Sequence, residues 1–307
     1  MPIIEIKNLT KHFGVTPAVE DLTCSIEPGE LFGLVGPDGA GKTTIIRTLC
    51  GIVPPTSGTA SVLGFDIIKQ RSEIVKRVGY LSQRFSLYGD LTVDENIAFF
   101  ARIHGVTDFV KRRDELLAFT RMQDARDRLA ERLSGGMKQK LALACTLIHA
   151  PKIIFLDEPT TGVDPVSRRD FWKILSTLLE QGITIMMSTP YLDEAERCSR
   201  VALMNEGRLL ELGTPRSIRD KLPGKVFEII CHPVRDAYKL ISSTNQAHEV
   251  QMYGDRLNVI LDSGNPPIEK LVESLKQKQI HVDSWRTVPP RLENVFISMM
   301  RTAHERH

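Results

Sequence analysis

The sequence predicts an α/β protein with a largely parallel core sheet, followed by a small α+β domain. Residues 153–156 (IIFL) and 183–188 (ITIMMS) are short apolar runs, which are typical of strands covered on both faces. Such strands alternate with helical patterns along the chain, which favours a parallel sheet. The alternation ends near residues 221–224 (KLPG), so we predict one domain over 1–224 and a second over 225–307.

Residues 1–35 alternate apolar and polar side chains, which predicts two or three strands with turns at 13–14 and 28–29. A glycine-rich loop follows the buried strand 30–35 and leads into a helix over about 42–50. The stretch from 94 to 132 is mostly helical and heavily charged. We interpret its charge runs as a solvent-exposed helix face.

The second domain is predicted to have the element order βαββαβ, followed by one more helix. The expected elements are strand 226–231, helix 235–241, strands 248–253 and 255–261, helix 268–278, strand 280–285 and a helix near 292–300. This order suits a ferredoxin-like unit. The domain shows no catalytic constellation, so we expect a role in interaction or dimerisation.

Composition is ordinary for a soluble globular protein: 42% of the 307 residues are hydrophobic, 25% are charged, and the net charge is +2. This charge gives no support for a nucleic-acid partner. The five cysteines are scattered without a CxxC pair, which fits a reducing compartment. No signal peptide and no apolar run near the roughly 20 residues of a membrane span is evident. We therefore expect a cytoplasmic protein that reaches a membrane only through a partner.

Residues 36–44 (GPDGAGKTT) match the phosphate-loop pattern G-x-x-x-x-G-K-[ST] between a buried strand and a helix. The glycines let backbone N–H groups surround phosphate oxygens, and the helix N-terminus favours the negative charge. Lys42 is expected at the β and γ phosphates of ATP, and the Thr43 hydroxyl at Mg²⁺. The predicted nucleotide-binding residues of this loop are Gly36, Pro37, Asp38, Gly39, Ala40, Gly41, Lys42, Thr43 and Thr44.

A second metal-holding group is expected at the end of the strand 153–158 (IIFLDE), which closes with two acids. Asp157 is predicted to hold Mg²⁺ directly or through water. Glu158 is predicted to orient or deprotonate the water that attacks the γ-phosphate.

Residues 133–139 (LSGGMKQ) lie between these two elements, and with them the chain from residue 1 to about 220 resembles the ATP-binding-cassette (ABC) family. The resemblance implies a P-loop NTPase cassette with an antiparallel β subdomain, a helical subdomain at about 84–140, and Mg²⁺-dependent ATPase activity. It further implies that Phe13 stacks on adenine and that Gln83 contacts metal and water.

The resemblance also implies a dimer. Ser134, Gly135 and Gly136 would serve the ATP bound to the opposite subunit, and Asp164 would lie in the loop that crosses the dimer interface. Two cassettes, identical or different, would close around two nucleotides and open after hydrolysis.

A cassette by itself does not specify transport, because members of this family also act in translation and DNA repair. The helical insertion is short, and residues 84–100, with Phe85, Leu87 and Tyr88, resemble the surface on which transporter cassettes dock a membrane partner. These three side chains could equally be core residues. Residues 289–300 (PPRLENVFISMM) resemble the closing segment of drug-efflux cassettes. The resemblance thus implies an exporter subunit on the cytoplasmic face of the inner membrane, working with a separately encoded permease.

One position departs from the family pattern. The switch histidine of the family would fall at Pro190, between residues that match the pattern on both sides. Proline offers neither a side-chain donor nor a backbone N–H, and losing such a donor costs roughly 10²–10³ in rate. We therefore expect either a slow ATPase, for which Ser188 and Thr189 are the candidate assisting groups, or a poor site paired with a different cassette. The alternative is a regulatory ATP-binding module with little turnover, against which the intact Glu158 argues.

Overall fold

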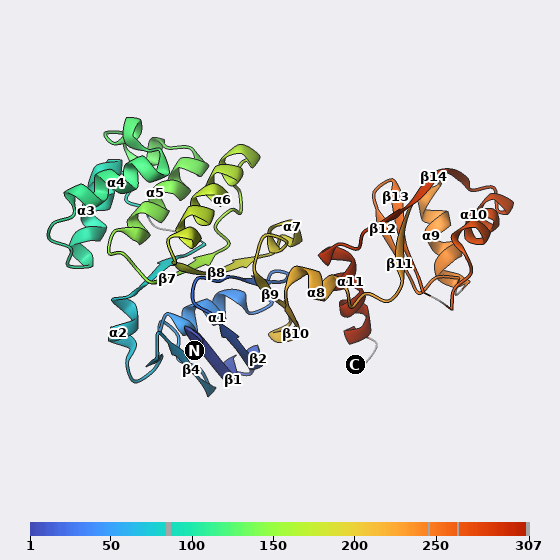
Figure 1. The fold of residues 1–307 in the computed structure, drawn as a ribbon, viewed down its shortest axis with the longest axis horizontal. Coiled ribbons are helices and arrows are strands. Elements are labelled where there is room, and N and C mark those ends of the chain that lie inside the picture. Colours follow the sequence, from blue (N-terminus) through green and yellow to red (C-terminus); the bar gives the residue numbers. More distant parts are fainter. Residues whose placement is uncertain (84–86, 245, 263, 305–307) are drawn as a thin grey trace. The chain divides into compact units, whose positions relative to one another are not determined.

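The computed structural model describes residues 1–83, 87–244, 246–262 and 264–304 (Figure 1). The chain divides into two compact units, Met1–Leu212 and Gly213–His307. This division precedes the predicted domain limit at 224 because the short helix α8 (Pro215–Arg219) contacts α11 (Leu292–His304) of the second unit. The functional limits 1–224 and 225–307 stay a prediction.

The first unit is built on a six-stranded sheet of order β10-β9-β3-β8-β7-β6, in which β9, β3, β8, β7 and β6 are paired in parallel. Its strands are β3 (Leu31–Val35), β6 (Val78–Leu81), β7 (Ile153–Asp157), β8 (Thr184–Thr189), β9 (Arg200–Asn205) and β10 (Arg208–Gly213). Every residue of β3, β7 and β8 is buried, which explains their continuous apolar patterns.

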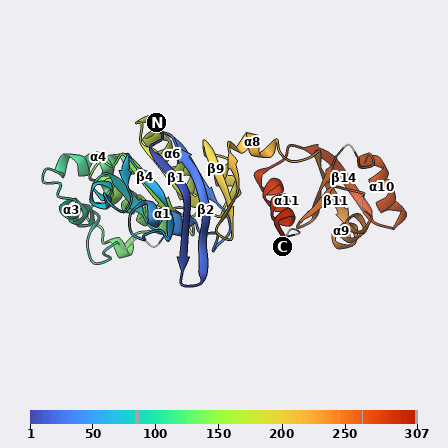
Figure 2. The same ribbon diagram turned by 90° about the horizontal axis from the view of Figure 1, so that it is seen from below.

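A smaller antiparallel sheet of order β2-β1-β4-β5 packs beside it in the first unit. Its strands are β1 (Ile4–Phe13), β2 (Thr16–Ile26), β4 (Ser57–Val62) and β5 (Phe65–Asp66). One core of buried side chains joins β1, β2 and helix α1 (Lys42–Leu49) to the parallel sheet. Figure 2 shows β1 and β2 as a long hairpin. These sheets confirm the predicted fold class; the sequence pattern did not reveal β4, β5, β6, β9 or β10.

The remaining helices of the first unit gather on the side of the parallel sheet opposite to the antiparallel sheet (Figure 1). These helices are α3 (Val93–Ile103), α4 (Val110–Thr120), α5 (Gly135–Leu147) and α6 (Pro165–Glu180), joined in part by the short 3₁₀ helices η1 (Gln123–Ala125) and η2 (Ala130–Arg132). Two further short helices, α2 (Arg71–Val75) and α7 (Leu192–Ala195), do not belong to this group. The charge runs also cross-link this region, because Asp94 pairs with Arg113 at 3.1 Å and with Arg126 at 2.7 Å.

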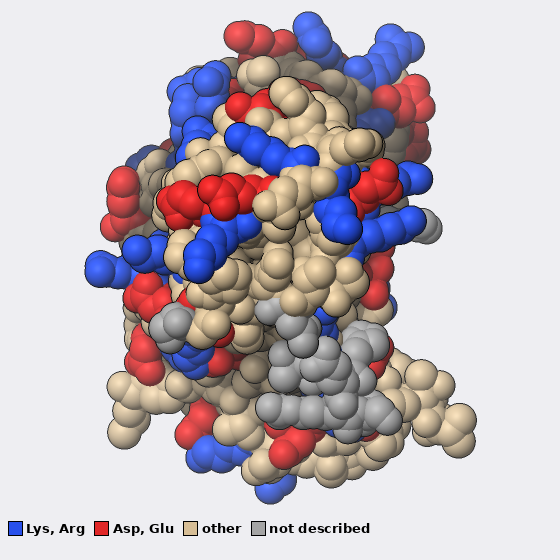
Figure 3. All heavy atoms as spheres, turned by 90° about the vertical axis from the view of Figure 1, so that its right-hand side faces the viewer, with Lys and Arg blue, Asp and Glu red and all other residues tan. Residues whose placement is uncertain are grey.

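The second unit has the element order βαββαβα and an antiparallel sheet of order β12-β13-β11-β14, which is ferredoxin-like topology. Its elements are β11 (Lys225–His232), α9 (Val234–Ser243), β12 (Glu249–Tyr253), β13 (Arg256–Leu261), α10 (Ile268–Gln277), β14 (His281–Val288) and α11. Apolar side chains of α9 and α10 pack on one face of the sheet. On the molecular face seen in Figure 3, basic and acidic side chains are interspersed.

Within the described ranges, no helix combines the length and the apolar character needed to cross a membrane.

Candidate functional site

Two glycines of the phosphate loop, Gly36 and Gly41, are required by close backbone approaches. A Cβ on Gly36 would lie 2.2 Å from the carbonyl oxygen of Met204, and one on Gly41 would lie 2.3 Å from that of Ala18. Gly41 also has φ 93°, a left-handed conformation that glycine adopts without strain. The loop therefore lies tightly against β2 and β9 and places the N-terminus of α1 at the end of β3.

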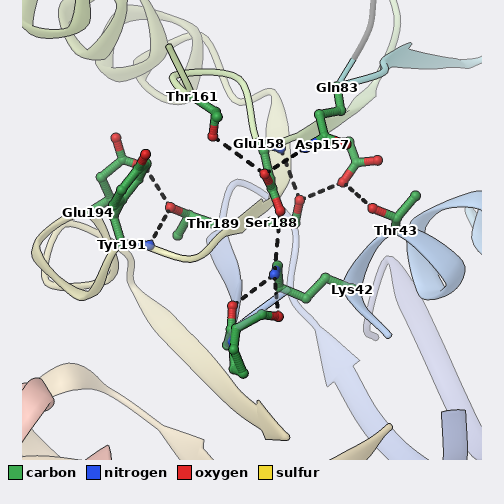
Figure 4. A network of polar contacts seen from close by, with 12 residues as sticks. Lys42, Thr43, Gln83, Asp157, Glu158, Thr161, Ser188, Thr189, Tyr191 and Glu194 are labelled. Carbon is green, nitrogen blue, oxygen red and sulfur yellow. Dashed lines mark hydrogen bonds and ion pairs between the residues drawn. The ribbon is translucent and has the colours of Figure 1, made fainter. Parts of the chain in front are cut away.

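Lys42 is buried at the start of α1, with its ammonium directed into the phosphate loop (Figure 4). Its Nζ donates to the carbonyl oxygens of Gly36 at 2.8 Å and Pro37 at 2.9 Å. The same Nζ lies 3.4 Å from Oε1 of Glu158, in an ion pair. The positive charge thus lies between the loop and the acid that follows β7, where a γ-phosphate is expected.

The Asp157 carboxylate is fully buried at the end of β7 and accepts hydrogen bonds from three hydroxyl groups. Its Oδ1 accepts from Thr43 at 2.9 Å and from Ser188 at 2.7 Å, and its Oδ2 accepts from Tyr80 at 3.4 Å. Burial raises the pKa of Tyr80 to about 12, so this phenol is a neutral donor.

A hydroxyl and a carboxylate are hard oxygen ligands, which suit Mg²⁺. Mg²⁺ in nucleotide sites takes one or two protein oxygens and completes its shell with phosphates and water. The pair Thr43 and Asp157 fits that requirement. No cluster of three or more His, Cys, Asp or Glu side chains suited to a metal occurs among the residues that the structure describes.

Glu158 follows Asp157 directly and has φ 50°, the left-handed region that is costly for a residue with a side chain. Its Oε2 accepts a hydrogen bond from Gln83 Nε2 at 2.9 Å and lies 3.4 Å from Thr161 Oγ1, which donates to it. The structure therefore brings Gln83 to the second acid, and the roles predicted for both residues stay predictions.

The signature residues form a second patch with Asp164. Ser134 caps α5 through its Oγ, which accepts from the N–H of Met137 at 3.3 Å, and Asp164 caps α6 by accepting from the N–H of Ser167 at 2.9 Å. A Cβ on Gly136 would lie 2.2 Å from Ser167 Oγ, so this glycine lets α5 approach α6. Ser134 and Gly135 are exposed. Hydrogen bonds from Ser167 hold the pKa of Asp164 below its usual value.

The nucleotide contacts predicted for the signature residues, which concern the opposite subunit, and for Phe13 stay predictions. No hydrogen bond or ion pair between described residues links Ser134, Gly135 or Gly136 to the phosphate loop. Phe13 lies at the end of β1 and is 53% exposed, with the Lys11 ammonium 5.0 Å from its ring centroid. The predicted adenine contact of Phe13 stays a prediction.

The segment around Pro190 is organised by a carboxylate that sequence analysis missed. Glu194 of α7 is buried and accepts hydrogen bonds from Thr160 Oγ1 at 2.5 Å and Thr189 Oγ1 at 2.8 Å. Thr189 Oγ1 also accepts from the N–H of Tyr191 at 3.0 Å. Thr160 and Glu194 have no characteristic spacing, so only the tertiary structure reveals the pair.

Both hydroxyl groups before Pro190 therefore donate to carboxylates: Ser188 to Asp157 and Thr189 to Glu194 (Figure 4). In this arrangement neither hydroxyl has a proton left to donate to a phosphate. Neither Ser188 nor Thr189 therefore replaces the hydrogen-bond donor that a histidine at position 190 would supply.

The parallel sheet, the phosphate loop and the two acids define a P-loop nucleotide-binding protein, and comparisons with known proteins narrow this class. Residues 19–161 match the family model described as ABC transporter. The chain is 41% identical over 305 residues to the probable multidrug ABC transporter ATP-binding protein YbhF of Escherichia coli (strain K12), covering 97% of this chain and 52% of that protein. It thus spans about half the length of this relative.

A second relative matches along its whole length. The linearmycin resistance ATP-binding protein LnrL of Bacillus subtilis (strain 168) is 30% identical over 306 residues, covering 97% of this chain and 98% of LnrL. A solved ATP-binding subunit of an ABC transporter superimposes with a TM-score of 0.65 at 28% identity, covering 71% of this chain and 92% of that one. The chain belongs to the ABC transporter family and resembles its ATP-binding proteins.

Proposed function

We propose that this chain binds ATP with Mg²⁺ and hydrolyses it. The observation that carries this proposal is the convergence of Lys42, Asp157 and Glu158 at the ends of β3 and β7, with Gln83 bonded to Glu158. Lys42 and the loop amides would bind the phosphates, while Thr43 and Asp157 would hold the ion. When bound, Mg²⁺ offsets the charge that develops on the phosphoryl oxygens.

In this mechanism Glu158 orients the attacking water and accepts its proton. The amide of Gln83 and the ammonium of Lys42 hold the two carboxylate oxygens in place, 2.9 and 3.4 Å away. The buried surroundings exclude bulk water from the carboxylate, which strengthens both interactions.

Removal of the metal tests the proposal directly. The purified chain is expected to release phosphate from ATP in Mg²⁺ buffer and to lose this release in excess EDTA, because Thr43 and Asp157 then have no ion to hold. Steady-state phosphate release measures the effect, and addition of Mg²⁺ beyond the chelator should restore the rate. Equal rates with and without chelator would contradict a magnesium-dependent mechanism.

We further propose that two cassettes close around ATP, through the patch formed by Ser134–Gly136 and Asp164. Exposed Ser134 and Gly135 at the N-terminus of α5 offer backbone N–H groups and a partial positive field to a phosphate of a facing subunit. The facing subunit can be a second copy of this chain or a different cassette.

The names of its relatives, a multidrug transporter subunit and a linearmycin resistance protein, support an export function for this chain. We propose that it powers a separately encoded membrane permease and works at the cytoplasmic face of the inner membrane. The transported compound would be contacted by that permease.

An apolar cleft of about 250 Å³ in the first unit supports the proposal that a permease binds this chain. Residues of α2, β6, α3 and α5 and of the segment after α1 line it, among them Ile52, Val75, Phe100 and His149. Ile52 is 48% exposed and Val75 43%. Burial lowers the pKa of His149 to about 4, so its ring is neutral at pH 7 and the cleft keeps its apolar character.

The cleft is continuous with part of the segment predicted to dock a partner. The Tyr88 ring lies 4.5 Å from that of Phe99, and Phe99 lies 5.5 Å from Phe100 in the cleft. Tyr88 is 45% exposed and Leu87 is half-buried, whereas Phe85 lies outside the described residues. We propose that an apolar cytoplasmic helix of the permease occupies this cleft.

A charge placed in the cleft tests this docking. Ile52→Asp is expected to weaken co-purification with the permease at least about tenfold, because burying a carboxylate under an apolar helix costs more than about 1–3 kcal/mol, even with Arg71 lining the same cleft. Val15→Asp is the matched control, since Val15 is 98% exposed at the tip of the β1–β2 hairpin. Both variants should bind ATP normally. If Ile52→Asp retains the permease as Val15→Asp does, the cleft is not the docking site.

A further inference from the structure

We propose that Ser188, at the end of β8, is the positioning residue for both acids of the site. This inference rests on the proposed binding and hydrolysis of Mg·ATP. Ser188 is fully buried on the strand next to β7, and Asp157 is its direct partner in the parallel register. One hydroxyl group therefore reaches two consecutive acids, and Figure 4 shows it between them.

The first contact fixes the orientation of the metal-holding carboxylate. Ser188 Oγ donates to Asp157 Oδ1 at 2.7 Å, and the Thr43 hydroxyl donates to the same oxygen at 2.9 Å. Thr43 is itself a predicted metal ligand: its oxygen would bind the ion through a lone pair, so the geometry of its bond to Asp157 would depend on the ion. Ser188 is not a predicted ligand, so its bond to Asp157 needs no ion. Groups that hydrogen-bond to a metal ligand typically set the metal affinity of the site as well as the orientation of that ligand.

The second contact fixes the backbone of the catalytic carboxylate. The N–H of Glu158 donates to Ser188 Oγ at 3.0 Å and to Ser188 O at 3.2 Å. The left-handed φ of 50° at Glu158 is strained for a residue with a side chain and persists only where the surroundings hold it. Ser188 supplies both acceptors for that N–H, so it maintains the turn that aims the Glu158 side chain at Gln83 and Lys42.

Neighbouring groups do not duplicate this role. Thr189 Oγ1 is bonded to Glu194 and to the N–H of Tyr191, and Pro190 has no donor. Tyr80 reaches only the other oxygen of Asp157, at 3.4 Å. In a chain whose switch position holds proline, Ser188 remains the contact from β8 to the two acids.

The test compares Ser188→Ala with Thr184→Val. Thr184 is equally buried at the other end of β8, and its Oγ1 accepts one hydrogen bond from a backbone N–H, that of Gly29 at 2.9 Å. The control variant therefore removes a comparable hydroxyl from the same strand without touching the acids. Thermal unfolding of both variants establishes that they fold.

The first readout is Mn²⁺ binding in the presence of ATP, followed by electron paramagnetic resonance of the free ion. We expect Ser188→Ala to bind Mn²⁺ about 10–100-fold more weakly, the usual effect of losing a group behind a metal ligand. ATP binding measured in EDTA should be unchanged, because Lys42 and the loop remain. The second readout is steady-state turnover, where kcat should fall and KM for Mg·ATP should rise, because a weaker hold on the ion also weakens binding of the Mg·ATP complex.

Native Mn²⁺ affinity in Ser188→Ala would overturn the inference, and so would an equal loss in Thr184→Val. The metal readout needs no hydrolysis. If the native chain binds Mn²⁺ with ATP but shows no turnover, the ATPase proposal fails, while the metal shift in Ser188→Ala still decides the role of Ser188.

Discussion

Glu158→Gln is expected to reduce ATP turnover by about 10²–10⁴, the usual contribution of a general base. Glutamine is similar in size and can still accept the hydrogen bonds from Gln83 and Thr161, but its amide cannot take a proton from water. ATP binding should persist, because Lys42 keeps its bonds to the carbonyl oxygens of Gly36 and Pro37. Steady-state phosphate release and equilibrium binding of a fluorescent ATP analogue measure the two quantities.

Glu180→Gln is the matched control, because Glu180 is an exposed residue at the end of α6 and the same charge is removed. Its turnover should equal that of the native chain. Turnover in Glu158→Gln close to the control value would show that another group activates the water, and the role given to Glu158 would be wrong.

Pro190→His is expected to raise kcat by up to about 10²–10³, which is the range for one preorganised donor to a developing oxyanion. Pro190 is only half-buried and lies after the last residue of β8, so a larger side chain can be accommodated without entering the core. The new ring would supply the proton that Ser188 and Thr189 have already donated to carboxylates.

Pro190→Ala separates the new donor from the removal of the proline ring. We expect the alanine variant to turn over at the native rate and the histidine variant to exceed it. The double variant Pro190→His with Glu158→Gln should be inactive, because a donor cannot replace the base. If Pro190→His is no faster than Pro190→Ala, the missing donor does not limit the rate, and a partner cassette becomes the more probable source of activity.

The phosphate loop and the acid pair could be predicted from sequence because each is a run of consecutive residues. Residues 36–44 carry the constraints of the loop locally: glycine where a Cβ would meet the backbone of Met204 or Ala18, and lysine at the helix start. The run IIFLDE likewise encodes a buried strand and its terminal acids in one segment. The βαββαβ order of the second unit followed from local periodicity in the same way.

Contacts between segments that are distant in the sequence could not be predicted in this way. Ser188 and Asp157 are 31 residues apart, and Thr160 and Glu194 are 34 apart. Their pairing depends on the order of strands in the sheet and on the register between β7 and β8. The apolar cleft draws residues from several helices and strands, and no single segment shows its pattern.

The sequence by itself determined that a phosphate-loop motif lies between a buried strand and a helix, that two acids follow a second apolar run, and that proline stands where the family pattern has a histidine. Only the tertiary structure decided which groups hydrogen-bond to those acids, and that the hydroxyl groups of Ser188 and Thr189 donate to the carboxylates of Asp157 and Glu194. The physical reason is that backbone conformation is largely encoded by neighbouring residues, whereas a hydrogen bond between two strands exists only once the sheet has set their register.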